Sequence, residues 1–387
     1  MKFSDVIGQQ HLKQQFVQTI KSGKVPHAQL FLGNIGHGGL ALALAYAQML
    51  NCENPAENDA CGICPSCQKA NKFIHPDIHF SYPFPKIDKK EVATDFIVDW
   101  RKMLAKLPYF SLQEWMQYFD AENKQANIPA DECRDIIRRL NLKSFESKYK
   151  VMIIWLPEYL GKEGNILLKI LEEPPIDTIF ILVAENQEAI LGTILSRTQI
   201  VKINSIETEL LSIALMENFN IQAENAFQIA SLAYGDFIEA QKLLTNESND
   251  SALLFMEWIQ LCLSPSLTSK TEVFQTLVKW VEKFSAIGRE NQKNTIRYGL
   301  HFFEQLFQYH ITGKLDCLNS EEKEFAQNFT SRVNFNNVDT LYKLLNNCHF
   351  YIERNVSAKI AMISISFKMS KILNGQHVLL PEELESI

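Results

Sequence analysis

Residues 33–40, with the sequence GNIGHGGL, have the outline of a phosphate-binding loop without the side chains that handle phosphate. The motif requires a glycine, four residues, a second glycine, a lysine, and then a serine or threonine. Gly33 and Gly38 fill the glycine positions, whereas Gly39 stands in place of the lysine and Leu40 in place of the hydroxyl. Backbone amides could still cradle an anion. Because the lysine reaches the outer phosphates and the hydroxyl ligates magnesium, the segment predicts a nucleotide scaffold that does not hydrolyse.

A second nucleotide-handling feature is missing after the apolar run 151–155, which is typical of a buried strand. Hydrolysis of a nucleoside triphosphate needs an acidic residue at the end of such a strand to hold magnesium. The run ends instead in Trp155 and Leu156, and Glu158 lies further on, out of register. One degenerate motif could arise by chance, but two on the same scaffold favour an inactive site.

Four cysteines lie close together, at Cys52, Cys61, Cys64 and Cys67. The last three are separated by two-residue gaps on a turn that contains glycine and proline, and Cys52 follows a predicted helix. Four thiolates at about 2.3 Å from zinc make a closed, structural site. A redox pair and unliganded thiols are the alternatives, and His75 and His79 are further candidate ligands. The remaining cysteines are expected to be buried thiols; they are Cys133, Cys262, Cys317 and Cys348.

Arg197 follows Ser196 just before the predicted strand 200–203. A guanidinium is always charged and forms forked bonds to phosphate oxygens, so an arginine at the rim of such a domain can serve a nucleotide on a neighbouring subunit. The alternative is an ordinary surface ion pair. A basic stretch also has two interpretations: its side chains contact a nucleic-acid backbone, or they form local ion pairs with Asp131, Glu132 and Asp135. It comprises Arg134, Arg138, Arg139, Lys143, Lys148 and Lys150.

The first 204 residues alternate strand-like and helix-like segments, which predicts an α/β domain with a parallel sheet. The expected strands are 29–32, 78–82, 151–155, 179–184 and 200–203. The expected helices are 9–22, 40–50, 130–140 and 165–172, with further local helices at 93–107 and 112–119 in an irregular insertion. After residue 204 the sequence shows helical periodicity and no strand pattern, which predicts helices only. A polar segment at 245–250 interrupts it and predicts a linker.

Composition restricts the class of protein. The net charge is −7 over 387 residues, which argues against a large basic face that grips nucleic acid unaided. No run approaches the ~20 apolar residues of a membrane span. The N-terminal residues lack the features of a secretory signal. A cytoplasmic protein without membrane contacts is therefore expected.

Several strings together resemble the delta-prime subunits of bacterial DNA polymerase III clamp loaders, which belong to the AAA+ superfamily. They are FSDVIGQQ at 3–10, PHAQLFLG at 26–33, LLKILEEPP at 167–175 and TILSRT at 193–198, together with the four-cysteine module. Thr198 replaces the cysteine that usually follows the arginine of the last string. The family contains ATP-hydrolysing subunits as well as inactive ones. The degenerate loop, Trp155, and Ile238 at the position of a nucleotide-contacting arginine favour the inactive type.

The resemblance implies an AAA+ α/β domain at 1–204 with the zinc module at 52–67, a helical lid at 205–248, and an all-helical collar at 249–387. It implies structural zinc, no bound ATP, and a place in a hetero-pentameric ring beside ATP-binding subunits and a delta-type subunit. Arg197 would reach a neighbour's ATP, and Ser196 would help to position the loop. The ring would load the sliding clamp onto primed DNA. An active ATPase with unusual loop chemistry, or a zinc-containing nucleic-acid-binding scaffold, are the alternatives.

Overall fold

The computed structural model describes residues 1–87, 91–121, 124–245, 248–264, 271–313, 315, 318, 320–354 and 356–376. The chain divides into two compact units. The first comprises Met1–Ile221 and Tyr234–Glu239, and the second comprises Gln222–Ala233 and Ala240–Ile387. The predicted lid, 205–248, contributes residues to both units, so the three-domain division remains a prediction.

The first unit is built on a five-stranded sheet of order β2-β5-β6-β1-β7, in which all neighbours are parallel. The strands are β1 (Ala28–Leu32), β2 (Ile78–Ser81), β5 (Lys150–Trp155), β6 (Thr178–Ala184) and β7 (Gln199–Lys202). Each lies within one residue of its predicted bounds, which confirms the α/β class. All residues of β5 and β6 are buried, which is why these strands appear as unbroken apolar runs.

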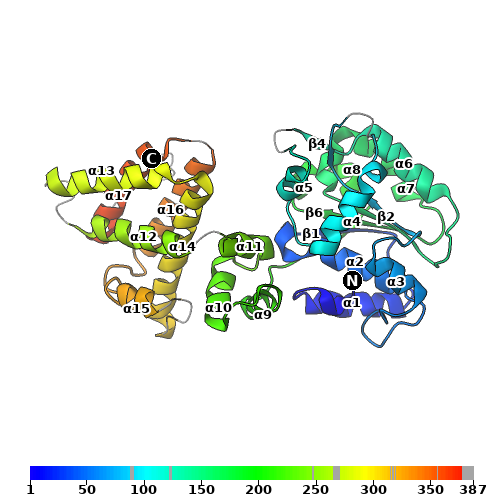
Figure 1. The fold of residues 1–387 in the computed structure, drawn as a ribbon, viewed down its shortest axis with the longest axis horizontal. Helices are drawn as coiled ribbons and strands as arrows, with labels where there is room; N and C mark the ends of the chain where they lie inside the picture. The colour runs from blue at the N-terminus through cyan, green and yellow to red at the C-terminus, as the bar shows by residue number, and fades with distance from the viewer. Residues whose placement is uncertain are drawn as a thin grey trace. The chain divides into compact units, whose positions relative to one another are not determined.

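Helices cover both faces of the sheet (Figure 1). On one face, α1 (Gln10–Lys21) and α2 (Gly39–Leu50) pack through a stack in which the ring of Phe16 lies 5.2 Å from Phe31 and 4.3 Å from Tyr46. Every residue of α2 is buried. On the other face, α6 (Ala130–Asn141), α7 (Leu168–Glu172) and α8 (Gly192–Leu195) share a core with alternate residues of β5 and β6. The ends of the central strands are therefore the accessible positions for a site.

The segment before α7 differs from its prediction. Residues 165–172 were expected to form one helix, but Pro157–Leu167 (η4) is a 3-10 segment, and the α-helix begins only at Leu168. Gly161 interrupts η4 with φ 49° and ψ −138°. This is left-handed φ, which glycine adopts without a Cβ penalty.

The insertion after β2 carries structure that the sequence did not reveal. Besides the 3-10 turn η3 (Ala93–Phe96) and helices α4 (Ile97–Lys106) and α5 (Leu112–Gln117), it contains two short antiparallel strands, β3 (Phe84–Pro85) and β4 (Ala126–Asn127). Its aromatic residues form a buried cluster. Trp100 stacks on Tyr82 at 4.0 Å and lies 5.2 Å from Trp155 at the end of β5. The insertion is thus packed against the end of a central strand.

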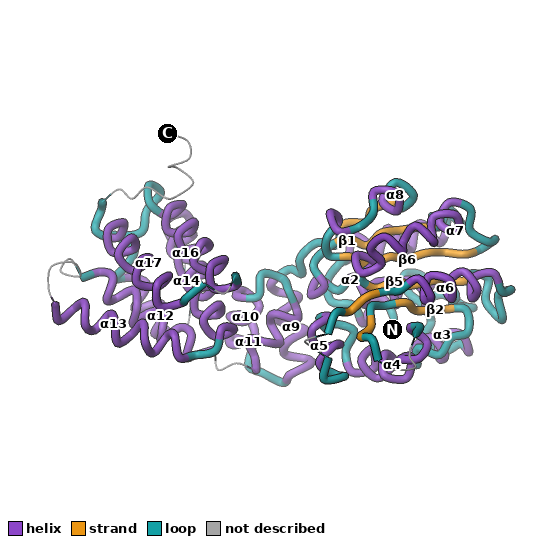
Figure 2. Tube along the Cα trace, turned by 90° about the horizontal axis from the view of Figure 1, so that it is seen from above, coloured by secondary structure: helices purple, strands orange, loops and turns teal. Residues whose placement is uncertain are grey.

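Beyond β7 the described elements are helical, as predicted (Figure 2). They are α9 (Thr208–Phe219), α10 (Ala223–Leu232), α11 (Phe237–Thr245), α12 (Ser248–Leu263), α13 (Thr271–Ala286), α14 (Arg289–Thr312), α15 (Ser320–Gln327), α16 (Val338–Glu353) and α17 (Ala358–Leu373). The predicted linker 245–250 is wrong in part, because Thr245 ends α11 and Ser248 begins α12; residues 246–247 lie outside the described part. A buried core that includes Phe255, Trp258 and Phe302 joins these helices in the second unit.

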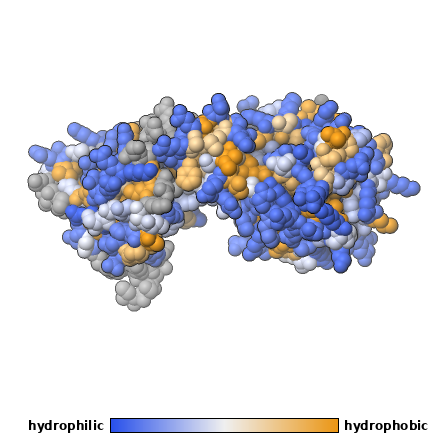
Figure 3. Space-filling model, turned by 90° about the horizontal axis from the view of Figure 1, so that it is seen from below, coloured by the Kyte–Doolittle hydropathy of each residue, from blue (hydrophilic) through white to orange (hydrophobic). Residues whose placement is uncertain are grey.

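The surface view in Figure 3 shows a largely hydrophilic face with separate hydrophobic patches. Exposed apolar side chains in the first unit include Ile63, Phe145 and Ile176. None of the helices in the described part of the chain combines the length and hydrophobicity that a bilayer span requires.

Candidate functional site

The loop at residues 33–40 contains the 3-10 turn η2 (Ile35–His37). Its successive N–H groups donate to protein acceptors. The N–H of Ile35 donates to Glu185 Oε1 at 3.2 Å, and that of Gly36 to Asn34 Oδ1 at 3.1 Å. Those of His37 and Gly38 donate to the carbonyls of Asn34 and Ile35, at 3.0 and 3.2 Å. Amides that would cradle a phosphate in an active loop are therefore already hydrogen-bonded within the chain.

The space around the loop is also filled. A Cβ on Gly36 would lie 1.7 Å from Oδ1 of Asp236, and one on Gly38 would lie 2.9 Å from the ring of Tyr109. Gly38 has φ +87°, a left-handed conformation that favours glycine. Asp236 and Tyr109 therefore approach the loop backbone more closely than they could if Gly36 or Gly38 carried a side chain.

Carboxylates surround the loop where an active site would present cations. Glu185 follows β6, and Glu158 accepts from the N–H groups of Glu185 and Asn186 at 2.6 and 2.8 Å. Burial raises the pKa of Glu158 above its usual value. Burial also raises the pKa of Glu185, and the charges of Glu158 and Asp236 add to that effect. This environment opposes the binding of a triphosphate, whose charge is of the same sign.

The end of β5, where an active relative is expected to carry a magnesium ligand, is part of an aromatic core. Trp155 is fully buried, and its ring lies 5.2 Å from both Trp100 and Phe110 of the insertion. Leu156, which follows it, is also buried and has φ 54°. Ile238 is 5% exposed, and it offers an apolar side chain where the resemblance places an arginine. These contacts give a packing role to the residues that replace the expected polar groups.

Arg197 is held in a defined orientation on the surface of the first unit. Its Nε and Nη2 donate to Glu172 Oε2 at 3.3 and 3.1 Å, and its Nη1 donates to the carbonyl of Thr193 at 3.0 Å. Ser196 Oγ lies 3.3 Å from Nη1 and donates to the same carbonyl at 3.1 Å. The side chain of Arg197 is 30% exposed. Ser196 thus contacts Arg197, and the bond to Glu172 is the surface ion pair given above as the alternative. The role of Arg197 and Ser196 toward a neighbour's ATP stays a prediction.

The arginines of the basic stretch form local ion pairs with neighbouring carboxylates, which is the second of the two interpretations given above. Arg134 pairs with Asp131 at 2.6 Å, and Arg139 pairs with Glu132 and Asp135, each at 2.8 Å. Arg138 also pairs with Asp135. Lys150 is buried on β5 and donates to the carbonyls of Leu140 and Leu142. Lys143 and Lys148 are exposed, and this leaves too small a cationic surface to indicate a nucleic-acid site.

The four predicted cysteines converge. The sulfur atoms of Cys52, Cys61, Cys64 and Cys67 all lie within 4.8 Å of one another, and those of Cys61 and Cys67 are 3.9 Å apart. A tetrahedron with zinc–sulfur bonds of ~2.3 Å has edges of about 3.8 Å, so the sulfur positions fit a tetrahedral metal ion. No disulfide joins the cysteines of the described part; Cys317 lies outside it.

Local backbone geometry prepares these sulfurs as ligands. The N–H of Cys61 donates to Cys52 Sγ at 3.3 Å, that of Cys64 to Cys61 Sγ at 3.4 Å, and that of Cys67 to Cys64 Sγ at 3.4 Å. The donation from Cys64 is the main cause that lowers the pKa of Cys61 to about 6. Cys64 also caps the N-terminus of α3 (Pro65–Asn71). Hydrogen bonds of this kind favour the thiolate, the form that binds metal, and they prevail at Cys61. Burial instead raises the pKa of Cys52 and of Cys67 above the usual value.

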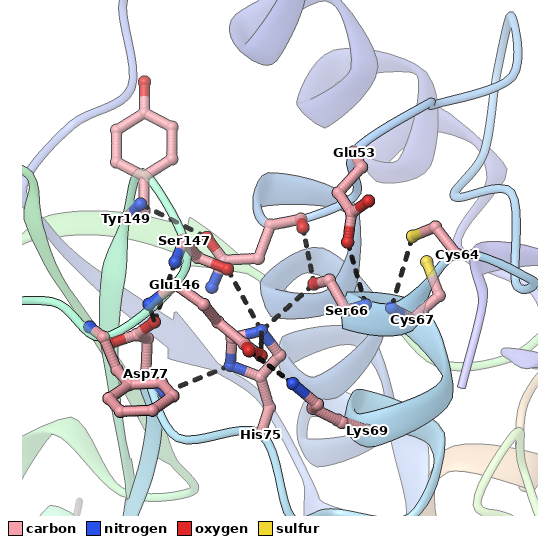
Figure 4. Close-up of polar contacts among 12 residues, drawn as sticks. Glu53, Cys64, Ser66, Cys67, Lys69, His75, Asp77, Glu146, Ser147 and Tyr149 are labelled. Carbon is pink, nitrogen blue, oxygen red and sulfur yellow. Dashed lines mark hydrogen bonds and ion pairs between the residues drawn. The ribbon is translucent and has the colours of Figure 1, made fainter.

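His75 supports the cysteine module from outside (Figure 4). Its Nδ1 accepts from the N–H of Asp77 at 3.1 Å, so its proton lies on Nε2, which is 3.0 Å from Ser66 Oγ and 3.1 Å from Ser147 Oγ. Burial lowers the pKa of His75. Neither His75 nor His79 joins the metal-ligating cluster that the described residues form, so the histidine alternative is not supported.

Asp77 fixes the next part of the same network. Its carboxylate accepts from the N–H groups of Phe145, Glu146 and Ser147 at 2.6, 2.9 and 2.9 Å. Burial would raise the pKa of Asp77, but these three hydrogen bonds lower it below its usual value. The cysteine module is thereby tied to the loop that leads into β5.

Three residues at the site were missed from the sequence: Tyr109, Glu185 and Asp236. Glu185 directly follows a predicted strand, a position that parallel sheets often use for function, and it could have been found on that ground. Tyr109 and Asp236 lie far from the loop in sequence. Their role depends on tertiary contacts with glycine, and no local pattern signals such contacts.

A family model described as "DNA polymerase III, delta subunit" matches residues 8–207, more than half of the 387 residues. Among relatives, the DNA polymerase III subunit gamma of Buchnera aphidicola is 25% identical over 86% of this chain and 83% of its own length. The DNA polymerase III subunit tau of Bacillus subtilis is 28% identical over 63% of this chain and 37% of its own. That of Escherichia coli is 25% identical over 54% and 26%.

The chain therefore spans most of the Buchnera relative but only a quarter to two fifths of the two tau subunits. Among solved structures, a gamma subunit-related protein of Thermotoga maritima aligns over 93% of this chain and 99% of its own, at 15% identity and a TM-score of 0.33. That similarity is too low to add to the fold described above.

Proposed function

Because the chain belongs to the family described as "DNA polymerase III, delta subunit", we propose that it is a delta-prime-type clamp-loader subunit that acts in DNA replication without hydrolysing ATP. The observation that carries this proposal is the state of the degenerate loop. The N–H groups of residues 35–38 are hydrogen-bonded within the chain, and Asp236 lies against Gly36. With neither a lysine nor a hydroxyl in the motif and Trp155 at the magnesium position, the groups needed for hydrolysis are missing.

The chain contributes instead an arginine to ATP on a neighbouring subunit. Arg197 is partly exposed. Its Nε and Nη2 each donate to Glu172, and its Nη1 donates to Thr193 and Ser196. A guanidinium has five N–H donors, so one hydrogen on Nη2 remains for a phosphate oxygen, and the contacts of Nη1 could be exchanged for another. Charge that develops on a transferring phosphoryl group is stabilised by such a donor supplied from outside the nucleotide's own subunit. Ser196 positions it.

The cysteine module has a structural role and would hold zinc through Cys52, Cys61, Cys64 and Cys67. Its closed set of four sulfurs leaves no position for a substrate. Bound zinc would fix the loop 52–67 between α2 and α3, next to the network of His75 and Asp77. The site is consistent with stabilisation of the α/β unit and with no chemical step.

The expected partners follow from the family and the resemblance. The chain would occupy a hetero-pentameric ring with ATP-binding subunits and a delta-type subunit, and the ring would place the sliding clamp on primed DNA. Contacts with DNA and with the clamp would be made by the assembly. The local pairing of Arg134, Arg138 and Arg139 is consistent with this, because it leaves little free positive charge on α6.

Reconstitution with candidate ATP-binding subunits tests the role of Arg197. Arg197→Ala should lower the DNA-stimulated ATP turnover of the assembly roughly tenfold or more, with fold and metal content unchanged. Arg134→Ala is the matched control, since this exposed arginine also pairs with a carboxylate but lies on α6; it should leave turnover unchanged. Equal turnover in the assemblies containing wild-type and Arg197→Ala chains would exclude the proposed role.

The names of the relatives, gamma and tau, raise a second candidate: a subunit that binds and hydrolyses ATP with unusual loop chemistry. Calorimetric titration of the isolated chain with Mg-ATP separates the two candidates. No binding at high micromolar concentration is expected. Micromolar affinity with turnover would favour the second candidate.

A further inference from the structure

We infer that the degenerate loop has an internal ligand: Tyr109 and Asp236 occupy the place of a nucleotide and fasten residues 234–239 to the loop. This inference rests on the proposed function, because it takes the loop as a nucleotide site that no longer binds, but it does not depend on Arg197. It assigns a binding role to two residues that neither the motifs nor the family resemblance singles out. Both residues, and every residue they are argued to contact, belong to the first unit.

Tyr109 reaches the loop from the insertion between α4 and α5. It is 2% exposed, and its hydroxyl oxygen accepts from the N–H of Ile7 at 3.0 Å. Its ring lies against Gly38, where a Cβ would approach Cε1 and the hydroxyl to 2.9 Å. Burial raises the pKa of this phenol. The residue therefore joins the N-terminal segment to the loop with both its polar and its apolar parts.

The segment 234–239 approaches from the start of α11. Phe237 is fully buried, and its ring lies 4.9 Å from that of Tyr109. Asp236 Oδ1 caps the helix by accepting from the N–H of Glu239 at 2.9 Å, while the same carboxylate lies directly over Gly36. The carbonyl of Gly235 accepts from the N–H of Ile206 at 3.0 Å. Residues distant in sequence thus meet on the loop through side chains.

These two groups fill the space that Gly36 and Gly38 leave open beside the loop. An aromatic ring supplies a flat apolar surface, and a carboxylate supplies an anion next to the loop backbone. A protein that must order several segments around a ligand gains stability only when that ligand is present. Here the ligand is covalently part of the chain, so the arrangement is held at all nucleotide concentrations.

Hydrogen–deuterium exchange of the full-length chain tests the inference, with the variants Tyr109→Ala and Phe110→Ala. Phe110 is the matched control: it is next in sequence and 3% exposed, but its ring packs against Trp100 and Trp155 and not against the loop. Both truncations remove a buried ring and should lower Tm by a similar amount, roughly 10 °C. Only Tyr109→Ala should raise exchange selectively at residues 34–38 and 234–239, by tenfold or more relative to β5 and β6.

Cavity complementation provides the second measurement. An apolar space left by a removed ring can take up a small aromatic molecule, so millimolar p-cresol should restore protection in Tyr109→Ala at 34–38 and 234–239, and should not do so in Phe110→Ala. If Tyr109→Ala fails to fold, Tyr109→Phe retains the ring and should raise exchange at the Ile7 amide while 234–239 stays protected. Equal exchange of 34–38 and 234–239 in Tyr109→Ala and Phe110→Ala, or loss of protection at 234–239 in Tyr109→Phe, would overturn the inference.

Discussion

Glu172 is the charged partner of the arginine on which the proposed function depends. The pair is solvent-accessible, with 60% of the Glu172 side chain exposed, and exposed ion pairs contribute about 0–1 kcal/mol. Thr193 and Ser196 retain contacts with the guanidinium without it. Glu172→Gln should therefore lower the ATP turnover of the assembly only about two- to threefold, a much smaller loss than Arg197→Ala produces. Steady-state assays of both variants, with kcat and KM separated, measure the difference; equal losses would contradict it.

His79, on β2, predicts a pH dependence. Burial, and then the charge of Arg139, lowers the pKa of His79 from 6.5 to about 4. The unfolded chain therefore binds this proton at higher pH than the folded chain does. The contribution of the neutral ring to the free energy of unfolding is at its full value above pH 6.5. It decreases as the pH falls from 6.5 to about 4, and below pH 4 this group causes no further change.

His79→Gln removes that titration. Urea unfolding of the two proteins at pH 7.5 and pH 4.5 should show a difference in pH sensitivity of roughly 2–3 kcal/mol, the wild type being the more sensitive. His11→Gln, on the surface of α1, is the control and should behave as the wild type does. An unchanged pH sensitivity in His79→Gln would mean that the pKa of His79 does not differ between the folded and the unfolded chain.

At the scale of elements, the cysteine module connects α2, α3 and the loop before β5. Metal analysis should find about one zinc per chain, and Cys64→Ser should abolish it and destabilise the first unit by several kcal/mol, because structural zinc contributes folding free energy. Cys133→Ala is the control: it removes a buried thiol on α6 that lies outside the cysteine module, and the variant should retain its zinc. Full zinc content in Cys64→Ser would show that the remaining sulfurs suffice.

The elements were more predictable than the contacts between them. The strands were found within one residue because β5 and β6 are buried along their whole length, so their residues form nearly unbroken apolar runs. The cysteine cluster was found because its ligands are close in sequence. The 3-10 character of η4 was missed, since Gly161 interrupts a segment whose apolar periodicity continues. β3 and β4 were missed because two-residue strands carry no period.

In the candidate site, too, the local sequence features could be predicted and the tertiary contacts could not. Gly39 in place of the motif's lysine, and Trp155 where a carboxylate was sought, are departures that the sequence shows directly; that they make the site inactive stays a prediction. The groups that fill the space beside the loop were not visible. Tyr109 and Asp236 act by approaching glycines, and the close approach of a side chain to a distant backbone leaves no trace in spacing or composition.

At the scale of the whole molecule, charge determines how the chain meets DNA. With a net charge of −7 and the arginines of α6 paired, the isolated protein should bind primed DNA with a Kd weaker than ~10 μM at 150 mM salt, within the range of non-specific binding. Fluorescence anisotropy measures this, and the reconstituted assembly should bind far more tightly. Tight, salt-resistant binding by the chain alone would favour a nucleic-acid-binding scaffold.

The sheet has two edges, β2 and β7, and the guanidinium of Arg139 covers part of the first. It donates to the carbonyl of Phe80, in the middle of β2, at 3.1 Å, and Glu132 and Asp135 hold it there. An open edge strand invites pairing with another chain, so this arginine blocks one route to self-association. The same network that pairs the arginines of α6 therefore also occupies a hydrogen-bond acceptor at this edge of the folded sheet.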